Sequence, residues 1–150
     1  MKRYPSSELY DDREILLSGL AEMPERYLNS FEKIRMTEKG VSKTELERLK
    51  VKTGLDYDEL ASALSVTRAT LINKKGKARF NAAVSERIIS IAGLYSYGFS
   101  VFEDEQKFIE WMSLPRRPLG GKTPLELIST QFGRDEVMTI IGRIEYGVYS

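Results

Sequence analysis

The sequence predicts an all-α protein, and three observations lead to that prediction. Apolar residues recur at helical spacing through most of the 150 residues. Residues that cap helix N-termini repeatedly precede these stretches, and glycines repeatedly follow them. No stretch shows the sustained alternation of apolar and polar residues that a β-hairpin requires. We therefore expect helices alone, in three parts that comprise residues 1–40, 41–98 and 99–150.

The first part, residues 1–40, is expected to form a peripheral helical arm. Residues 6–20 show a loose amphipathic pattern. A second helix should begin with Pro24 in its first turn and end at Gly40. Its apolar stripe consists of four residues: Tyr27, Leu28, Phe31 and Ile34.

The second part, residues 41–98, contains sharper helix signals. Two pairs of residues have the spacing of a capping box: Ser42 with Glu45, and Asp56 with Glu59. Gly54 is expected to end the first of these helices. A long helix is predicted over residues 81–97, and Gly98 should end it. One face of that helix carries Val84, Ile88, Ile91, Ala92 and Tyr95.

Residues 57–76 match the pattern of a helix-turn-helix unit. Its buried positions are occupied by Leu60, Leu64, Val66 and Leu71, with Ala61 at the small position where the two helices touch. Two residues depart from the common pattern. Ser65 occupies a turn position that usually has glycine, and Lys74 occupies a position that is more often apolar.

The second helix of such a unit enters the major groove and offers its first residues to base edges. Here Thr67, Arg68, Thr70 and Asn73 lie on that helix. Arginine can bind guanine, and asparagine adenine, through paired hydrogen bonds. The basic residues that follow are expected to contact phosphates, which position the protein without specifying sequence: Lys74, Lys75, Lys77 and Arg79. Two copies should bind a pseudo-palindrome.

The charge distribution favours this interpretation. Residues 41–80 carry nine basic and five acidic side chains, a net charge of about +4, whereas the flanking parts are slightly acidic. The alternative is a solvated basic face on a helical hairpin that does not bind DNA, because helix-turn-helix geometry alone does not establish function.

The third part, residues 99–150, is predicted to hold three short helices. The acidic run Glu103-Asp104-Glu105 suits the first turn of one helix, which Trp111 helps to bury. Residues 114–121 are rich in proline and glycine and should be a loop. Thr123, Pro124 and Glu126 form a strong helix start. Gly133 should separate that helix from a last one that begins near Asp135.

The chain ends on Tyr146-Gly-Val-Tyr-Ser150, directly after an apolar-periodic helix. The buried face of that helix would carry Val137, Ile140, Ile141, Ile144 and Val148. Tyrosine combines a large apolar surface with a polar tip, so this end either folds back on its own core or fits a cleft in a partner. In the second case Arg143 and Glu145 could form charge-assisted hydrogen bonds at the rim of that cleft.

The composition argues against catalysis. The chain has no histidine and no cysteine, so it lacks the commonest general base and metal ligand and any thiolate chemistry. We expect no catalytic residue, no metal and no cofactor. No apolar run approaches the roughly 18 residues that span a bilayer. No signal-peptide core follows Met1, and we expect a cytoplasmic protein.

Three ordered motifs carry a resemblance to a known family: Leu119-Gly-Gly-x-Thr-Pro-Leu-Glu-Leu127, Gly133-x-x-x-Val137 and Arg143-Ile-Glu-Tyr-Gly-Val-Tyr-Ser150. Over residues 41–150 the chain resembles the Xre/MbcA/ParS antitoxins of type II toxin–antitoxin modules, whose toxin is a RES-domain protein. The resemblance implies an antitoxin that dimerises and, with its toxin, represses its own operon. It also implies a C-terminal toxin-binding domain whose end blocks the active site of an NAD-consuming toxin.

The predicted toxin contacts are Arg143, Glu145, Tyr146, Gly147, Val148, Tyr149 and Ser150. The expected partners are the RES toxin, double-stranded operator DNA, a second copy of the chain and a toxin–antitoxin hetero-oligomer, with no membrane. A stand-alone helix-turn-helix regulator, whose C-terminal domain only dimerises, is the alternative. An enzyme is the third and weakest interpretation.

Overall fold

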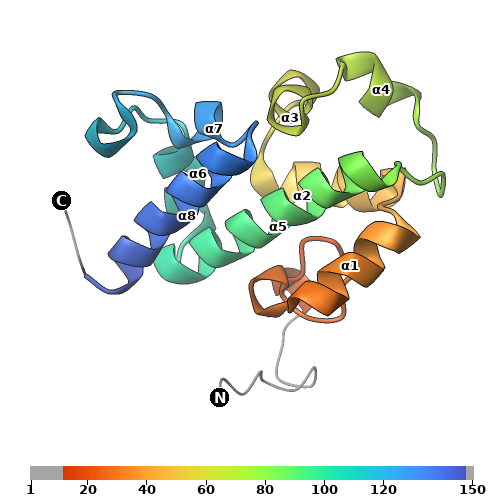
Figure 1. The fold of residues 1–150 in the computed structure, drawn as a ribbon, viewed down its shortest axis with the longest axis horizontal. Helices are drawn as coiled ribbons and strands as arrows, with labels where there is room; N and C mark the ends of the chain where they lie inside the picture. Colours follow the sequence, from red (N-terminus) through yellow and green to blue (C-terminus); the bar gives the residue numbers. More distant parts are fainter. Residues whose placement is uncertain (1–11, 148–150) are drawn as a thin grey trace.

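The computed structural model describes residues 12–147, and within that range its regular elements are all helical (Figure 1). Extended pairing in these residues is limited to two isolated bridges. The α-helices are α1 (Ser30–Lys39), α2 (Lys43–Thr53), α3 (Tyr57–Leu64), α4 (Arg68–Asn73), α5 (Ala82–Phe102), α6 (Glu105–Met112), α7 (Pro124–Leu127) and α8 (Gln131–Glu145). Three 3-10 turns are η2 (Asp12–Glu14), η3 (Glu25–Tyr27) and η4 (Arg117–Leu119). The all-α prediction is confirmed.

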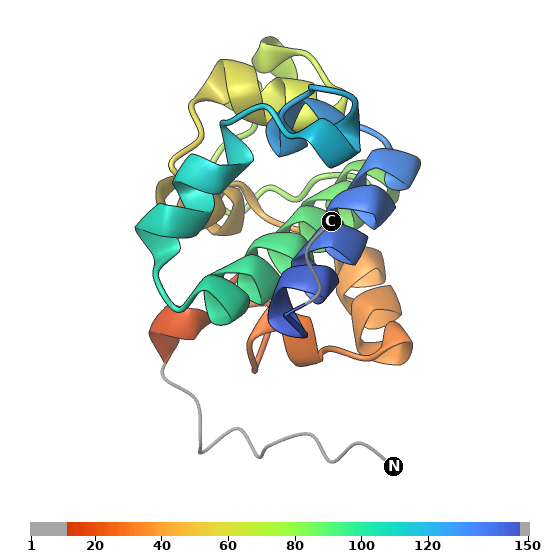
Figure 2. The ribbon, with the colours of Figure 1, turned by 90° about the vertical axis from the view of Figure 1, so that its left-hand side faces the viewer.

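The 21-residue helix α5 runs through the middle of the molecule, and α1, α6 and α8 pack against it (Figures 1 and 2). All five residues predicted for its apolar face are buried. Its predicted end at Gly98 is wrong, because the helix continues to Phe102. A side chain at Gly98 would come within 2.1 Å of the Phe108 ring, so this glycine allows α6 to pack closely. The predicted boundary between residues 98 and 99 therefore falls inside α5.

The N-terminal part differs from its prediction. Where the sequence predicts a helix over residues 6–20, described residues 12–20 form only the turn η2 and a loop. The helix expected from Pro24 is divided into η3 and α1, because the Asn29 side chain accepts a hydrogen bond from the Glu32 amide and starts α1 there. Gly40 does end α1.

The predicted stripe of the α1 region is confirmed at Leu28 but wrong at Phe31 and Ile34. Phe31 and Ile34 are 75% and 52% exposed, whereas Leu28 and Met36 are buried. The break at Asn29 changes the helical phase, so residues on either side of it no longer share one face. Residues 12–28 are named here the N-terminal strap. Five of its apolar side chains lie in the core, so the strap is integrated rather than peripheral: Ile15, Leu16, Leu17, Ala21 and Leu28.

Glu25 fixes the loop of the N-terminal strap from inside the core. Its buried carboxylate accepts hydrogen bonds from the backbone amides of Leu16 at 2.9 Å and Leu17 at 2.8 Å. Burial raises the pKa of Glu25 to about 7, although those amides and the positive charge of Arg48 oppose the rise. The strap thus carries a carboxylate that changes charge near neutral pH.

The C-terminal helices are held by an aromatic cluster and by their caps. Phe108 packs against Tyr95, Phe102 and Trp111, with ring centroids 5.2–5.8 Å apart. Thr123 and Glu126 form the predicted capping box of α7. The predicted start of the last helix near Asp135 is wrong, because α8 begins at Gln131 with Thr130 as its N-cap.

Gly133 lies inside the first turn of α8 instead of separating two helices. A Cβ atom at this position would lie 1.7 Å from the carbonyl oxygen of Leu127. The glycine therefore allows α8 to begin directly against the end of α7. Sequence reasoning assigns this residue to a helix end because glycine is commonest there.

Candidate functional site

Helices α3 and α4 form the predicted helix-turn-helix unit. Leu60, Ala61, Leu64 and Leu71 are all buried, and Val66 is partly buried against the core. Asp56 and Glu59 complete a reciprocal capping box at the start of α3. The Ser42–Glu45 pair forms only half of one, because Ser42 accepts from the Glu45 amide while the Glu45 carboxylate lies near Arg79.

The two departures from the helix-turn-helix pattern have local explanations. Ser65 has a φ of 54°, the left-handed conformation that usually favours glycine. Its side chain donates a hydrogen bond to the carbonyl oxygen of Ser129, 3.0 Å away, which links the turn to the segment before α8. Lys74 is half-buried, with its ammonium group 5.4 Å from the centre of the Phe80 ring.

The predicted base-reading residues lie on one short exposed helix. Thr67 caps α4 by accepting a hydrogen bond from the Thr70 amide at 3.2 Å. Arg68, Thr70 and Asn73 are exposed. Arg68 forms an ion pair with Asp58 at 3.7 Å, and both side chains are mostly exposed. Such a pair is weak, so it leaves the guanidinium free to move to an anionic ligand.

The basic residues after α4 do not share one environment. The helix ends at Asn73, because Lys74 is already extended. Lys75 and Lys77 are exposed in the following loop. Lys74 packs on an aromatic ring, as described above, and the partly exposed Arg79 binds groups of its own chain. Of the four predicted phosphate contacts, Lys75, Lys77 and Arg79 are thus exposed, but Arg79 is already paired within the chain.

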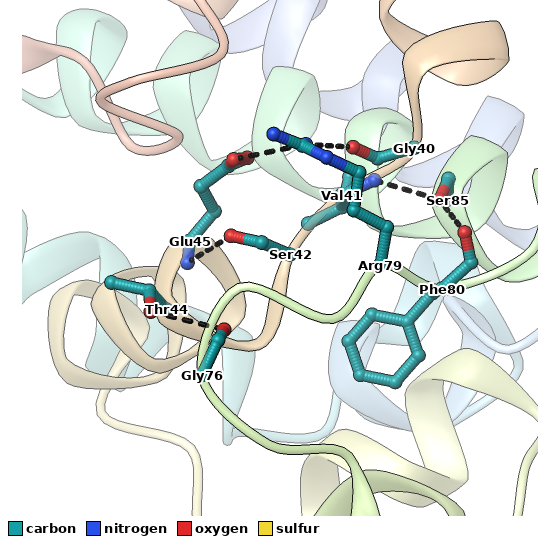
Figure 3. Close-up of polar contacts among 9 residues, drawn as sticks. All are labelled: Gly40, Val41, Ser42, Thr44, Glu45, Gly76, Arg79, Phe80 and Ser85. Atoms are coloured by element: carbon teal, nitrogen blue, oxygen red, sulfur yellow. Dashed lines mark hydrogen bonds and ion pairs between the residues drawn. The ribbon is translucent and has the colours of Figure 1, made fainter.

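Figure 3 shows the environment of Arg79. Its Nη1 atom donates a hydrogen bond to the carbonyl oxygen of Gly40 at 2.6 Å and lies 3.4 Å from Oε1 of the buried Glu45. The guanidinium thus neutralises a buried carboxylate. The contact gives Arg79 a structural role that the charge pattern of the sequence does not reveal.

The loop that carries Lys75 and Lys77 is tied to the start of α2 (Figure 3). The Thr44 hydroxyl donates to the carbonyl oxygen of Gly76 at 3.1 Å. The Phe80 amide donates to the carbonyl oxygen of Val41 at 2.8 Å. Ser85 accepts from the Val41 amide and donates to the Phe80 carbonyl oxygen. These contacts hold the loop at both ends and fix its position relative to α4.

The second candidate surface is the end of α8. Arg143 is exposed, and Tyr146 is 77% exposed beyond the last helical residue. Gly147 has a φ of 71°, and no atom outside its chain neighbours would meet a side chain there. Val148, Tyr149 and Ser150 lie outside the described residues. As far as the structure describes it, the C-terminal end does not fold back on the core.

Glu145 differs from its neighbours because its carboxylate binds within the chain. Oε1 accepts a hydrogen bond from the Tyr97 hydroxyl at 2.8 Å, and Oε2 lies 3.6 Å from the Arg26 guanidinium. Burial, together with this hydrogen bond, raises the pKa of Tyr97 to about 12. The phenol therefore remains a proton donor to Glu145 at neutral pH.

A groove is lined by residues of α1, α5 and α8. Helices α1 and α8 both pack against α5 (Figure 2). The groove has a volume of about 410 Å³ and is lined by Lys33, Ser90, Tyr97, Arg134, Met138 and Tyr146. Both polar and apolar side chains line it. The groove begins at the exposed end of α8, beside Tyr146.

Sequence reasoning missed Arg134, which is buried within α8. Its guanidinium donates to the carbonyl oxygen of Ile128 at 2.9 Å and to the Gln131 side chain at 3.2 Å. Burial, together with the nearby positive charge of Arg87, lowers the pKa of Arg134. No sequence signal distinguishes this arginine from the exposed arginines, because its burial depends on the close approach at Gly133.

Two features are absent from residues 12–147. These residues contain no group of histidine, cysteine, aspartate or glutamate side chains that could hold a metal ion. Nor do they include a helix long and apolar enough to cross a membrane.

Two family models match the chain. The model of the antitoxin Xre/MbcA/ParS C-terminal toxin-binding domain matches residues 98–147, and that of the antitoxin Xre-like helix-turn-helix domain matches residues 32–93. The first match covers the end of α5 and α6 to α8. The second covers most of α1, then α2 to α4 and the first half of α5.

Three curated proteins are similar to the chain. Antitoxin Xre of Yersinia enterocolitica is 30% identical over 113 residues, which cover 74% of this chain and 76% of that protein. Antitoxin Xre of Photorhabdus laumondii is 38% identical over 76 residues, and the match spans about half of each chain. The Prs ADP-ribosylating antitoxin of a Sphingobium species is 25% identical over 130 residues, which cover 79% of this chain and 81% of that protein.

Proposed function

The chain belongs to the Xre/MbcA/ParS family of antitoxins, and on that premise we propose that it neutralises a toxin with its C-terminal end. Proteins of this family act by binding rather than by catalysis, in agreement with the expectation that the chain is not an enzyme. The observation that carries the proposal is the last turn of α8, where Tyr146 is exposed instead of packed. An exposed aromatic residue at a chain end can anchor in a pocket of a partner.

The proposed partner is a RES-domain toxin that consumes NAD. Two arguments support it: the motifs of the C-terminal domain, and the relative from Sphingobium, whose name associates it with ADP-ribosylation. In this proposal Tyr146, Val148 and Tyr149 enter the cleft of the toxin, and Gly147 permits the bend between them. Arg143 lies at the rim, where charge-assisted hydrogen bonds are available.

The helix-turn-helix unit is proposed to bind the operator of the same operon and to repress it. Thr67, Arg68, Thr70 and Asn73 would face base edges in the major groove. Lys75 and Lys77 would contact phosphates from the tethered loop. Because one six-residue helix presents few contacts, two copies of the chain across a pseudo-palindrome are proposed. This activity would take place in the cytoplasm.

A growth assay tests the proposal. The protein encoded beside this chain is expressed alone, with the full chain, and with a version that ends at Gly142. We expect growth arrest, rescue by the full chain and no rescue by the truncated chain. The circular dichroism and melting temperature of the truncated chain must first match those of the full chain. Equal rescue by the truncated chain would favour the alternative, a stand-alone regulator whose C-terminal domain only dimerises.

A further inference from the structure

The N-terminal strap contacts the end of the chain that the proposed function assigns to toxin binding. We propose that Arg26 of the strap and Tyr97 of α5 are positioning residues for toxin binding, and that they act through Glu145. They hold the last turn of α8 and so set the direction in which residues 146–150 leave the fold. This inference rests on the proposed function, which does not itself assign any role to the strap.

The carboxylate of Glu145 is held from two sides. The Tyr97 hydroxyl donates to Oε1 at 2.8 Å, and the Arg26 guanidinium lies 3.6 Å from Oε2. The side chains of Arg26 and Glu145 are only 21% and 30% exposed. An ion pair shielded to this degree and supported by a charge-assisted hydrogen bond from a phenol is stronger than an open surface pair.

Arg26 is itself fixed to α5. Its backbone amide donates to Oγ of Ser96 at 3.0 Å, and its Nη1 atom donates to Oγ of Ser100. Its guanidinium carbon lies 4.9 Å from the ring centre of Tyr27 and 5.3 Å from that of Tyr97. One side chain therefore joins the strap, α5 and α8.

The other end of the strap is anchored on α2. Nζ of Lys52 donates to the carbonyl oxygen of Arg13 at 2.8 Å, and Nε of Arg48 donates to that of Ile15 at 3.4 Å. Glu25, adjacent to Arg26, binds the backbone amides of Leu16 and Leu17. The strap thus contacts both matched regions. It is fixed to α2, which belongs to the residues that match the helix-turn-helix model. It also contacts α8, which belongs to the residues that match the toxin-binding model. It begins before either matched region.

In the last turn of α8, Ile144 packs partly buried against the core, but the residues after it are less well held. Glu145 is the final helical residue, Tyr146 is exposed and Gly147 has open space around its Cα atom. Helix ends fray when they lack such contacts. A frayed end would have to be ordered during binding, and that ordering weakens affinity. The Arg26–Tyr97–Glu145 cluster removes this penalty in advance.

This geometry also revises the interpretation of Glu145. The sequence suggests a direct contact with the toxin, but both carboxylate oxygens already face partners in the same chain. Direct contact and positioning make different predictions in a double-mutant cycle. If Arg26 acts through Glu145, removing Arg26 has little further effect once the Glu145 carboxylate is gone. If Glu145 touches the toxin, the two effects add.

The test is a calorimetric titration of the protein encoded beside this chain with purified full-length variants. Arg26→Ala and Glu145→Gln are each expected to weaken binding about five- to tenfold. Tyr97→Phe should weaken it by less, because Glu145 keeps its ion pair with Arg26 in that variant. The double variant R26A/E145Q should bind about as well as the weaker single variant. Arg35→Ala, which removes an exposed arginine of α1, should leave the affinity unchanged.

A second readout uses the free chain. Amide hydrogen exchange of residues 143–147 should become faster in Arg26→Ala and Tyr97→Phe, whereas exchange in α3 should stay unchanged. A variant with faster exchange in α3 is globally destabilised and is replaced in the comparison by Arg26→Lys, which keeps the charge but not the forked geometry.

The outcomes separate the two ideas. If the wild-type chain does not bind the neighbouring protein, the proposed function fails and the positioning roles fall with it. If the wild-type chain binds and the Arg26 and Tyr97 variants bind equally well, only the inference is overturned. Additive losses in the double variant would also overturn it, because they would make Glu145 a direct contact.

Discussion

The guanidinium of Arg79 lies 3.4 Å from the carboxylate of Glu45, on the inner side of the loop that follows the helix-turn-helix unit (Figure 3). Glu45 is buried. Among the described residues, Arg79 is the only one that forms an ion pair with Glu45. The same basic run therefore contains residues with different roles. Arg79 pairs with a buried carboxylate, while Lys75 and Lys77 lie exposed in the loop.

Replacing Arg79 by alanine should mainly affect stability. The buried carboxylate of Glu45 would lose its partner, and the carbonyl oxygen of Gly40 would lose a donor. We expect the free energy of unfolding in urea to fall by about 1–3 kcal/mol. Lys77→Ala is the matched control, with a change within about 0.5 kcal/mol. Equal stability of the two variants would refute the structural role of Arg79.

The base-reading assignment predicts a separation of functions. The double variant R68A/N73A should lose site-specific operator binding in a mobility-shift assay while it still rescues cells from the toxin, because α4 and α8 are distinct surfaces. Each lost base contact should reduce discrimination by about 1–3 kcal/mol. Undiminished specific affinity would show that α4 is not the recognition helix.

Lys75→Ala and Lys77→Ala should act on all DNA sequences alike. Each removes one proposed phosphate contact, so the slope of log K against log salt concentration should become shallower by roughly one unit per residue. Filter binding at several salt concentrations measures this slope on operator and on random DNA. A loss confined to the operator would contradict the assignment as phosphate contacts.

Two helical glycines, Gly133 in α8 and Gly93 in α5, should respond in opposite ways to replacement by alanine. Gly133→Ala would place Cβ 1.7 Å from the carbonyl oxygen of Leu127, and we expect a loss of more than about 3 kcal/mol of stability, as for severe overpacking. Gly93→Ala in α5 meets no atom within 4 Å and should be neutral or stabilising by up to about 1 kcal/mol. Thermal unfolding measures both, and a well-folded Gly133→Ala variant would disprove the close contact.

Glu25 predicts a pH dependence of stability. Its pKa rises from 4.5 to about 7 on folding, so the folded state holds the proton more tightly than the unfolded state does. The contribution of protonated Glu25 to the free energy of unfolding is complete below about pH 4.5. It is lost as the pH rises to about 7. Since one pKa unit corresponds to about 1.4 kcal/mol, the loss can reach roughly 3 kcal/mol.

Urea unfolding at pH 5 and pH 8 measures this effect, and Glu25→Gln should flatten the difference between the two. The matched control is Glu38→Gln, because Glu38 is exposed on α1 and its replacement should leave the pH dependence unchanged. A wild-type chain that gains stability between pH 5 and pH 8 relative to Glu25→Gln would contradict the raised pKa.

Local chemistry made much of the fold predictable. The buried faces of α3 and α5, the caps at Asp56 and Thr123, and the end of α2 at Gly54 follow from spacing and capping preferences that act within one or two turns. These signals do not depend on distant residues, so they can be read from the chain alone.

The predictions fail where the structure or the role of a residue depends on another residue that is distant in the sequence. Gly98 and Gly133 look like helix ends, but each allows another element to approach closely. Arg79 looks like a phosphate contact because its partner, Glu45, lies 34 positions away. The strap looks peripheral in the sequence because its hydrogen-bond partners lie far along the chain, on α2 and α5. Glu145 could not be placed for the same reason, since Arg26 and Tyr97 come from other parts of the chain.

The central proposal, neutralisation by the C-terminal end, is tested most directly by the rate of NAD consumption of the purified neighbouring protein. That rate is measured while the full chain, or the chain ending at Gly142, is titrated in. We predict inhibition by the full chain that saturates at a fixed molar ratio, and little or no inhibition by a folded truncated chain. Equal inhibition by both chains would contradict the proposal and move the neutralising surface elsewhere on the molecule.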